Sequence, residues 1–342
     1  MLHLDGSFGE GGGQIVRTSL SLAVLSGRSV RLTNIRGGRP KPGLRPQHLT
    51  VVNALAGISR AEVQGASLDS RELTFRPQRV EGGHYCFDVA EKRGSAGAVS
   101  LIAQALLPPL LHAAGPSSLV LRGGTHVPWS PPAHYLLHVF LPALKELGVQ
   151  ADMALTRWGW YPRGGGEIRL SLQPCRLLEP VRWATPMSAT RFQGLSAASG
   201  VPAHVSARQA RRLRERLGES LPVAEAAADS RDPGSFVFLW APRAGFGALG
   251  ARGKPAEKVA DEAADALLSY IEASAAADRH LADQLVLYLA QARGPSTVTV
   301  EAVTTHLLTN IWVIEQFWGP TFRVRGKAGE PGEIFCHGGR GP

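Results

Sequence analysis

The stretch DGSFGEGGGQIVRTSLSLAVLSG, residues 5–27, joins a glycine-rich turn to an apolar helix that ends at Gly27. Glycines at 9, 11, 12 and 13 permit backbone conformations that side chains forbid. Because a helix N-terminus attracts anions, this turn can hold a phosphate, and Glu10 can help bind a divalent cation that bridges phosphate oxygens. The same features also fit a tight strand-to-helix turn with a solvated glutamate.

The order of elements that begins here recurs twice. After the first helix come a strand, a loop and a second helix (residues 29–58). A helix, a strand and a helix follow again within residues 94–148 and from residue 280 to 319. A shared order without shared residues indicates a duplicated α/β unit, although chance alternation in an α+β chain gives the same pattern.

Residues 185–277 differ in composition, being rich in alanine and charge, and are long enough to fold alone. We therefore predict an α/β (α+β) fold. Its core comprises three repeated α/β units, residues 1–184 and 278–342, and its smaller inserted α/β domain comprises residues 185–277.

Two glycine patterns fail as nucleotide loops. GFGALG (245–250) has dinucleotide-loop spacing, but Gly253 and Pro255 follow where a helix must begin, so we expect a turn. The Gly-Lys pairs at 253 and 326 lack the Ser or Thr of a phosphate-binding loop. The Gly/Pro-rich tail after Arg325 is expected to be loose at its end.

Bulk composition favours a globular protein with an acidic partner. The 342 residues are 44% hydrophobic and 19% charged, with a net charge of +9. Only six of the 37 cationic side chains are Lys; a genome-wide arginine preference would produce the same bias. Three distant cysteines support neither a disulfide framework nor a zinc site. Without a leader or membrane-length apolar run, we expect a cytoplasmic protein that does not span a membrane, and the oligomeric state stays open.

Residues 36–45, RGGRPKPGLR, form a loop that we call the basic loop. No acidic residue occurs from Gly11 to Ala61. Cations spaced by glycine and proline suit several phosphates at once, as along a nucleic-acid strand. A solvated charge run is the alternative interpretation.

His280 and His306 each begin an apolar helix. A histidine at a helix start can be a structural cap. At His306, however, the helix dipole would lower the imidazole pKa and keep the ring neutral and nucleophilic. Asp283, one turn beyond His280, can orient a base or a metal, or interact with the helix dipole.

Seven segments in order resemble the RNA 3'-terminal phosphate cyclases, and they span residues 4 to about 317 apart from the insert. They are DGSFGEGGGQIVRTSLSLAVLSG, IRGGRPKPGLRPQHL, GSAG, RGGT…PPAHY, RGGGEI, HLADQLVLYLA and THLLTNIWVIEQF. The resemblance implies ATP-dependent conversion of an RNA 3'-phosphate to a 2',3'-cyclic phosphate. It implies a covalent histidine–AMP, then an RNA adenylate, with ATP and a divalent cation (Mg or Mn) as cofactors and RNA ending in a 3'-phosphate as partner.

The resemblance also implies site residues. His306 would be the nucleophile and Glu10 the metal ligand in the phosphate loop. The other implied positions, polar or nucleotide-contacting, are Arg17, Arg36, Arg39, Gln47, Gln104, Pro131 and Asp283. Arg45 would add to charge neutralisation. The chain departs from the family at His280, where a tyrosine against adenine is usual, and at His126, which follows GGT. Both departures bear on nucleotide affinity and selectivity, and a changed metal dependence is the alternative for His126.

Two rival functions stay open. The first is a non-catalytic, cyclase-like RNA-binding scaffold, which would be expected to lack the nucleophilic histidine. The second is a transferase for phosphorylated small molecules, which would not need the THLLTN helix start.

Overall fold

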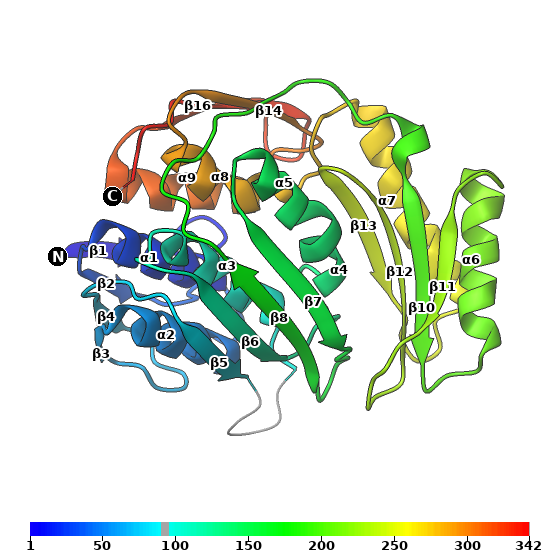
Figure 1. Ribbon diagram of the computed structural model, residues 1–342, viewed down its shortest axis with the longest axis horizontal. Coiled ribbons are helices and arrows are strands. Elements are labelled where there is room, and N and C mark those ends of the chain that lie inside the picture. The colour runs from blue at the N-terminus through cyan, green and yellow to red at the C-terminus, as the bar shows by residue number, and fades with distance from the viewer. Residues whose placement is uncertain (90–95, 342) are drawn as a thin grey trace.

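The computed structural model describes residues 1–89 and 96–341 (Figure 1). Of the GSAG segment, Gly94 and Ser95 lie outside the described residues. Within the two described ranges, the strands form four four-stranded sheets that carry packed helices. No helix there combines the length and the apolarity needed to cross a membrane.

The first sheet has a mixed topology. Its first two strands are parallel and joined by a helix, the second pairs antiparallel with the last, and the third lies at the edge. Val30 and Leu32 are buried while Arg31 between them is exposed, the alternation of a strand with one face on a core. Its elements are β1 (Leu2–Asp5), α1 (Gly13–Ser26), β2 (Val30–Thr33), α2 (Pro46–Ser59), β3 (Glu62–Gln64) and β4 (Leu73–Arg76).

The second sheet repeats this topology in the order β5-β6-β8-β7, again with its first two strands parallel. Its second helical segment contains a π-helical turn, η1. The elements are β5 (His84–Asp88), α3 (Val99–Leu110), β6 (Ser117–Gly123), α4 (Ala133–Tyr135), η1 (Leu136–Phe140), α5 (Leu141–Glu146), β7 (Ala151–Arg157) and β8 (Gly166–Leu172).

The third sheet has the same order, β9-β14-β16-β15, with β9 and β14 parallel. Its first strand precedes the inserted segment in sequence and its first helix follows it. The elements are β9 (Arg182–Trp183), α8 (Leu281–Gln291), β14 (Ser296–Val300), α9 (Thr305–Trp318), β15 (Phe322–Arg325) and β16 (Gly332–Cys336). The predicted α/β fold with repeated units is confirmed, and the inserted segment interrupts the third repeat.

The fourth sheet, order β11-β10-β12-β13, stands beside the second sheet (Figure 1) and carries α6 and α7 on one face. It has its own buried cluster, which includes Phe192, Val237 and Tyr270. The boundaries at 185 and 277 stay a prediction. The elements are β10 (Gln193–Ser199), α6 (His204–Leu217), β11 (Val223–Ala227), β12 (Gly234–Ala241), β13 (Ala244–Leu249) and α7 (Ala256–Ala273).

The GFGALG segment is a strand, β13, and the predicted turn is wrong. It pairs antiparallel with β12 along its whole length. A Cβ at Gly245 would lie 2.8 Å from both Phe238 and Val139. The glycine therefore allows β13 to approach the second unit closely. The tail also holds a strand that the sequence did not predict, since Ile334 of β16 is buried.

Helix α1 connects the units. It packs against α2, α3 and α9, and α9 packs on α8. Ile15, Leu20 and Leu22 have no exposed surface. This packing brings the glycine turn before α1 to the start of α9.

Candidate active site

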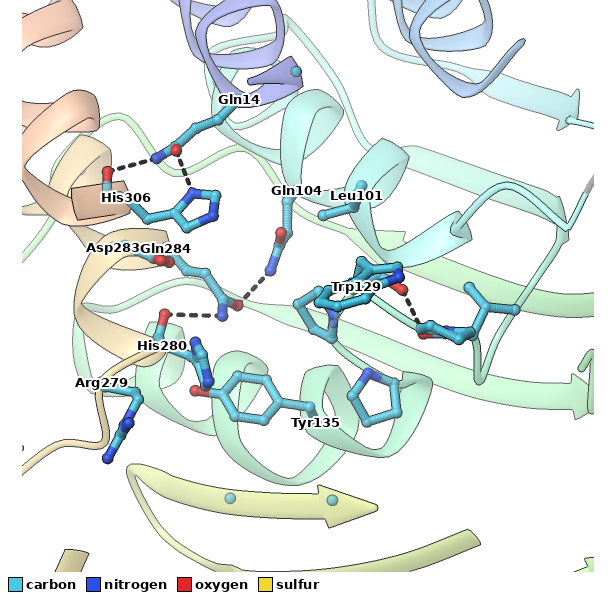
Figure 2. Close-up of a pocket in the computed structure, with 18 of the residues that line it drawn as sticks. Gln14, Leu101, Gln104, Trp129, Tyr135, Arg279, His280, Asp283, Gln284 and His306 are labelled. Atoms are coloured by element: carbon cyan, nitrogen blue, oxygen red, sulfur yellow. Dashed lines mark hydrogen bonds between the residues drawn. The ribbon is translucent and has the colours of Figure 1, made fainter. Parts of the chain in front are cut away.

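A cleft of about 1560 Å³ opens where the three units and the fourth sheet meet. Figure 2 shows part of its lining. Ten of the residues that the sequence points to line it, whereas Arg45 and His126 do not: the ten are Glu10, Arg17, Arg36, Arg39, Gln47, Gln104, Pro131, His280, Asp283 and His306. The structure therefore brings together residues separated by up to 296 positions in the chain, while their individual roles stay predictions.

His306 lies in the first turn of α9, whose start is capped by the Thr304 hydroxyl accepting from the Leu307 N–H at 3.0 Å. The Gln14 amide nitrogen donates to the His306 backbone carbonyl at 2.7 Å, and its oxygen faces ring Nδ1 (Figure 2). Because that oxygen can only accept, Nδ1 must carry a proton. In the neutral ring, Nε2 therefore carries the lone pair.

Glu10 lies beside that nitrogen. Its Oε2 is 2.7 Å from His306 Nε2, and its Oε1 pairs with Arg39. The turn that carries Glu10 needs its glycines: Gly9 and Gly11 both have φ of 56°, and a Cβ at Gly9 would sit 2.5 Å from the Thr309 hydroxyl. The N-terminal turn and α9 thus form one site.

Several groups set the charge of His306. Burial lowers the pKa of the His306 imidazole; the Glu10 carboxylate opposes this effect, and the Arg17 and Arg39 guanidinium groups add to it. The net direction is downward, which favours the neutral ring, while the 2.7 Å contact between Nε2 and Glu10 Oε2 is an ion pair only when the ring is protonated. A neutral imidazole in a cationic site has the form that a nitrogen nucleophile requires.

Arg17 lies on the cleft side of α1. Burial lowers its pKa to about 10, which leaves it charged at neutral pH. Its guanidinium makes no hydrogen bond or ion pair with any residue in the described ranges. Asp283 lies nearby, and burial raises the pKa of its carboxyl well above the ordinary value. A neutral carboxyl can donate a hydrogen bond to a ligand, whereas it binds a cation poorly.

The basic loop is held in shape by one of its own arginines. Arg36, with φ of 56°, donates to the carbonyl oxygens of Lys41 at 2.7 Å and Gly43 at 3.0 Å. Arg45 pairs with Asp69 and does not line the cleft, so the expectation that it neutralises charge in the site is wrong. This pairing could not be predicted from the sequence, because Asp69 lies beyond the acid-free stretch.

The opposite wall presents amide groups. Gln104 donates to the Gln284 side-chain oxygen, and Gln284 donates to the His280 carbonyl oxygen at 2.9 Å (Figure 2). The His280 ring is exposed toward the cleft, with Pro131 among the other lining residues. Amides and an exposed imidazole can bind a base edge and a base face.

His126 lies in the core, away from the cleft lining. Its ring stacks on Trp158 with 4.1 Å between centroids, and its Nε2 is 2.8 Å from His134 Nδ1. His126 therefore offers no ligand to the cleft, and its effect on nucleotide selectivity or metal dependence stays a prediction.

A divalent cation fits the site only together with ligand phosphates. Within residues 1–89 and 96–341 no group of three His, Cys, Asp or Glu side chains could hold a metal. Glu10 Oε2, however, is buried without an aligned hydrogen bond, which is unfavourable for a carboxylate oxygen. A cation that carries phosphate oxygens and water would satisfy it, as Mg²⁺ commonly does with one carboxylate.

The cleft also holds residues that were not predicted from the sequence, among them Gln14, His48, Trp129, Gln284 and Asn310. Gln14 follows the glycines directly and lies one helical turn before Arg17, so helical spacing was the available signal. Asn310 accepts from the Thr18 hydroxyl at 2.7 Å and donates to the Asp283 carbonyl oxygen at 2.7 Å. No local pattern marks it.

Together, the fold and the cleft define a protein of repeated α/β units with a cationic site around a histidine. The family model of the RNA 3'-terminal phosphate cyclases matches residues 8–324. The chain belongs to that family.

Similar proteins include the RNA 3'-terminal phosphate cyclases of Thermococcus kodakarensis (46% identical, 97% of each chain) and Methylococcus capsulatus (47% identical, 99% of this chain and 97% of the other). The cyclase of Methanosarcina barkeri is 42% identical over 96% of this chain and 98% of its own.

Proposed function

We propose that the protein is an ATP-dependent RNA 3'-phosphate cyclase with His306 as its nucleophile. The observation that carries the proposal is the position of His306 Nε2. This nitrogen lies in the cleft 2.7 Å from Glu10 Oε2 and near the charges of Arg17 and Arg39, while the Gln14 side chain holds Nδ1. Family membership supports the substrate class, since the relatives named above are RNA 3'-terminal phosphate cyclases.

The reaction would proceed in three steps. His306 Nε2 attacks the α-phosphorus of ATP, so that an N–P bond forms and the bond to pyrophosphate breaks. An oxygen of the RNA 3'-phosphate then attacks the same phosphorus and displaces the imidazole. Finally the neighbouring O2' loses its proton and attacks the 3'-phosphorus, which closes the ring and releases AMP. The RNA 3'-phosphate is a poor electrophile, and joining it to AMP by way of the histidine adduct gives it a good leaving group. The attacking O2' is already held next to the 3'-phosphorus.

The chain's own residues would support these steps. Arg17, which has no partner in the described ranges, and Arg39 would stabilise charge on the transferred phosphate. Glu10 would hold the divalent cation that accompanies ATP, and this cation would supply charge neutralisation. Gln14 would keep the Nε2 lone pair directed into the cleft.

The test is self-labelling by ATP labelled at the α-phosphate in the presence of Mg²⁺ or Mn²⁺. We expect an acid-labile, alkali-stable label on the wild type, no label on His306→Ala, and normal labelling of His204→Ala, whose exposed side chain is outside the cleft. Adding RNA with a 3'-phosphate should then yield cyclic ends.

Other results would favour the rival functions. RNA binding without any label would indicate the scaffold, and label that never passes to RNA would indicate a small-molecule transferase. Label retained by His306→Ala would exclude His306 as the nucleophile.

A further inference from the structure

Trp129 is the most unusual side chain of the cleft. Its side chain is 100% exposed, whereas Trp160 and Trp183 are each 3% exposed. Among the exposed large hydrophobic residues of the described ranges, it alone also lines the cleft. Exposing a whole indole gains nothing for folding, because burial of that apolar surface would stabilise the chain.

The backbone of the loop that carries Trp129 is constrained. Residues 127–132 read VPWSPP, and three prolines restrict the backbone. The Ser130 hydroxyl donates to the Val127 carbonyl oxygen at 3.1 Å, and Ala133 N–H donates to the Thr125 carbonyl oxygen at 2.8 Å. Trp129 itself has φ of 65°, a conformation that bulky residues rarely adopt and that is concentrated at functional sites.

The position of the Trp129 ring argues against a role in binding the base of ATP. Figure 2 shows Gln104 between His306 and Trp129, and its amide donates to Gln284, which in turn donates to the His280 carbonyl oxygen. A nucleotide whose α-phosphate reaches His306 would occupy that interior wall. A ring with all of its surface exposed lies at the rim, where a polymer would leave the cleft.

The charge of the cleft fits a polyanion. The acidic side chains in the lining other than Asp283 have cationic partners, and burial raises the pKa of Asp283 toward the neutral form. With Asp283 neutral, the lining holds five cationic side chains against four carboxylates, and its cations Arg17 and Arg36 form no ion pair in the described ranges. The ion pairs are Glu10 with Arg39, Glu262 with Lys254, Glu301 with Arg279, and Asp265 with Arg216, which lies outside the lining.

We propose that Trp129 is a stacking platform for a base near the 3' end of a single-stranded RNA. The phosphates at the 3' end of that RNA would lie toward Arg17 and Arg36, and one of its bases would stack on the indole of Trp129. Base–aromatic stacking is the usual way in which proteins bind unpaired nucleotides. The inference rests on the proposed function for the identity of the substrate.

The test measures binding of a short single-stranded RNA that ends in a 3'-phosphate, without ATP. Trp129→Ala should weaken binding roughly 5- to 100-fold, as expected for the loss of one stacked base, and Trp129→Phe should recover most of it. Leu177→Ala removes another exposed apolar side chain, 72% exposed and outside the cleft lining, and should bind as the wild type does.

Oligonucleotides that lack one base at a time would locate the contact. Removing the stacked base should weaken binding to the wild type but have little further effect on Trp129→Ala. RNA should also quench tryptophan fluorescence less in Trp129→Phe. Equal RNA affinity of Trp129→Ala and wild type would overturn the proposal. So would an equal loss of self-labelling by ATP and of RNA binding, because the ring would then serve ATP.

The two proposals fail in different ways. RNA binding that depends on Trp129, in a protein that never acquires a label from ATP, would overturn the catalytic function and support the platform. A labelled protein whose RNA binding ignores Trp129 would do the reverse.

Discussion

At the scale of single residues, the hydrogen bonds of Gln14 determine which nitrogen of His306 can react. The amide nitrogen is committed to the His306 carbonyl oxygen at 2.7 Å, so the amide oxygen must face Nδ1. An isolated neutral imidazole has no such constraint on its tautomer. Gln14 therefore directs the lone pair of Nε2 into the cleft and is a positioning residue for the proposed nucleophile.

Replacing Gln14 by Met keeps the length of the side chain and removes both hydrogen bonds. We expect self-labelling by ATP to slow by about tenfold, which corresponds to roughly 1.4 kcal/mol, because the ring loses its fixed tautomer and orientation. Nitrogen NMR of the histidine rings should show His306 with the proton on Nδ1 in the wild type and a mixture in the variant.

Thr18→Val is the control for Gln14→Met. It removes another hydrogen bond between α1 and α9, from Thr18 to Asn310, without touching His306. An equal loss of labelling in both variants would mean that Gln14 only ties the two helices together.

At the scale of elements, one glycine allows the starts of α1 and α2 to meet. A Cβ at Gly13 would lie 2.1 Å from Nε2 of His48, and that ring is only 3% exposed. His48 Nδ1 accepts from the Arg45 N–H at 3.1 Å, and burial with nearby arginines lowers the His48 pKa to about 3. The neutral ring therefore packs directly against the first residue of α1.

Gly13→Ala should destabilise the protein by about 1–3 kcal/mol, the usual cost of overpacking, because the buried ring cannot move aside. Gly57→Ala is the matched control in α2. No heavy atom lies within 4 Å of its added Cβ, so it should stabilise by about 0.5–1 kcal/mol. Urea unfolding of both variants measures the difference. A Gly13→Ala protein as stable as the wild type would contradict the proposed packing.

At the scale of the whole molecule, buried histidines join the second unit to the fourth sheet. His126 contacts Phe236 of β12 with ring centroids 4.7 Å apart, and His138 stacks on Trp240 at 4.5 Å. Burial lowers the pKa of His134 to about 3 and that of His126 well below its ordinary value. Both rings are neutral in the folded protein.

This burial makes stability depend on pH. The unfolded chain binds protons at these histidines near pH 6.5, whereas the folded chain binds one at His134 only near pH 3 and at His126 only well below its ordinary pKa. The stabilisation that depends on these neutral histidines is therefore fully present above pH 6.5. As the pH drops toward 3, the free energy of unfolding falls by at most about 1.4 kcal/mol per pH unit for each histidine.

We expect the thermal midpoint to fall between pH 7 and pH 5. The fall should be smaller in His134→Asn, which removes one buried titrating group, and unchanged in His204→Ala, whose ring is exposed. Calorimetry at several pH values measures this. A wild-type midpoint that stays constant over this range would contradict the expectation.

The repeated α/β fold could be predicted from the sequence because its signals are local. Glycine at 27 ends α1, alternation marks the strands, and apolar periodicity marks the helices, each within about 20 residues. The GFGALG segment shows the limit of such signals. Its glycines allow close packing against Val139 and Phe238, and a residue pattern does not distinguish that role from a turn.

The helices, the order of the repeats and the residue types available for the site can be predicted from the amino-acid sequence. Long-range packing is responsible for the pairing of Arg45 with Asp69, the burial of His126, the contact between Gln14 and His306, and the exposure of Trp129 at the cleft. The difference lies in the distance over which each effect acts. Helix and turn preferences act between neighbours in the chain, whereas the surroundings of a side chain depend on segments that packing brings together from hundreds of residues away.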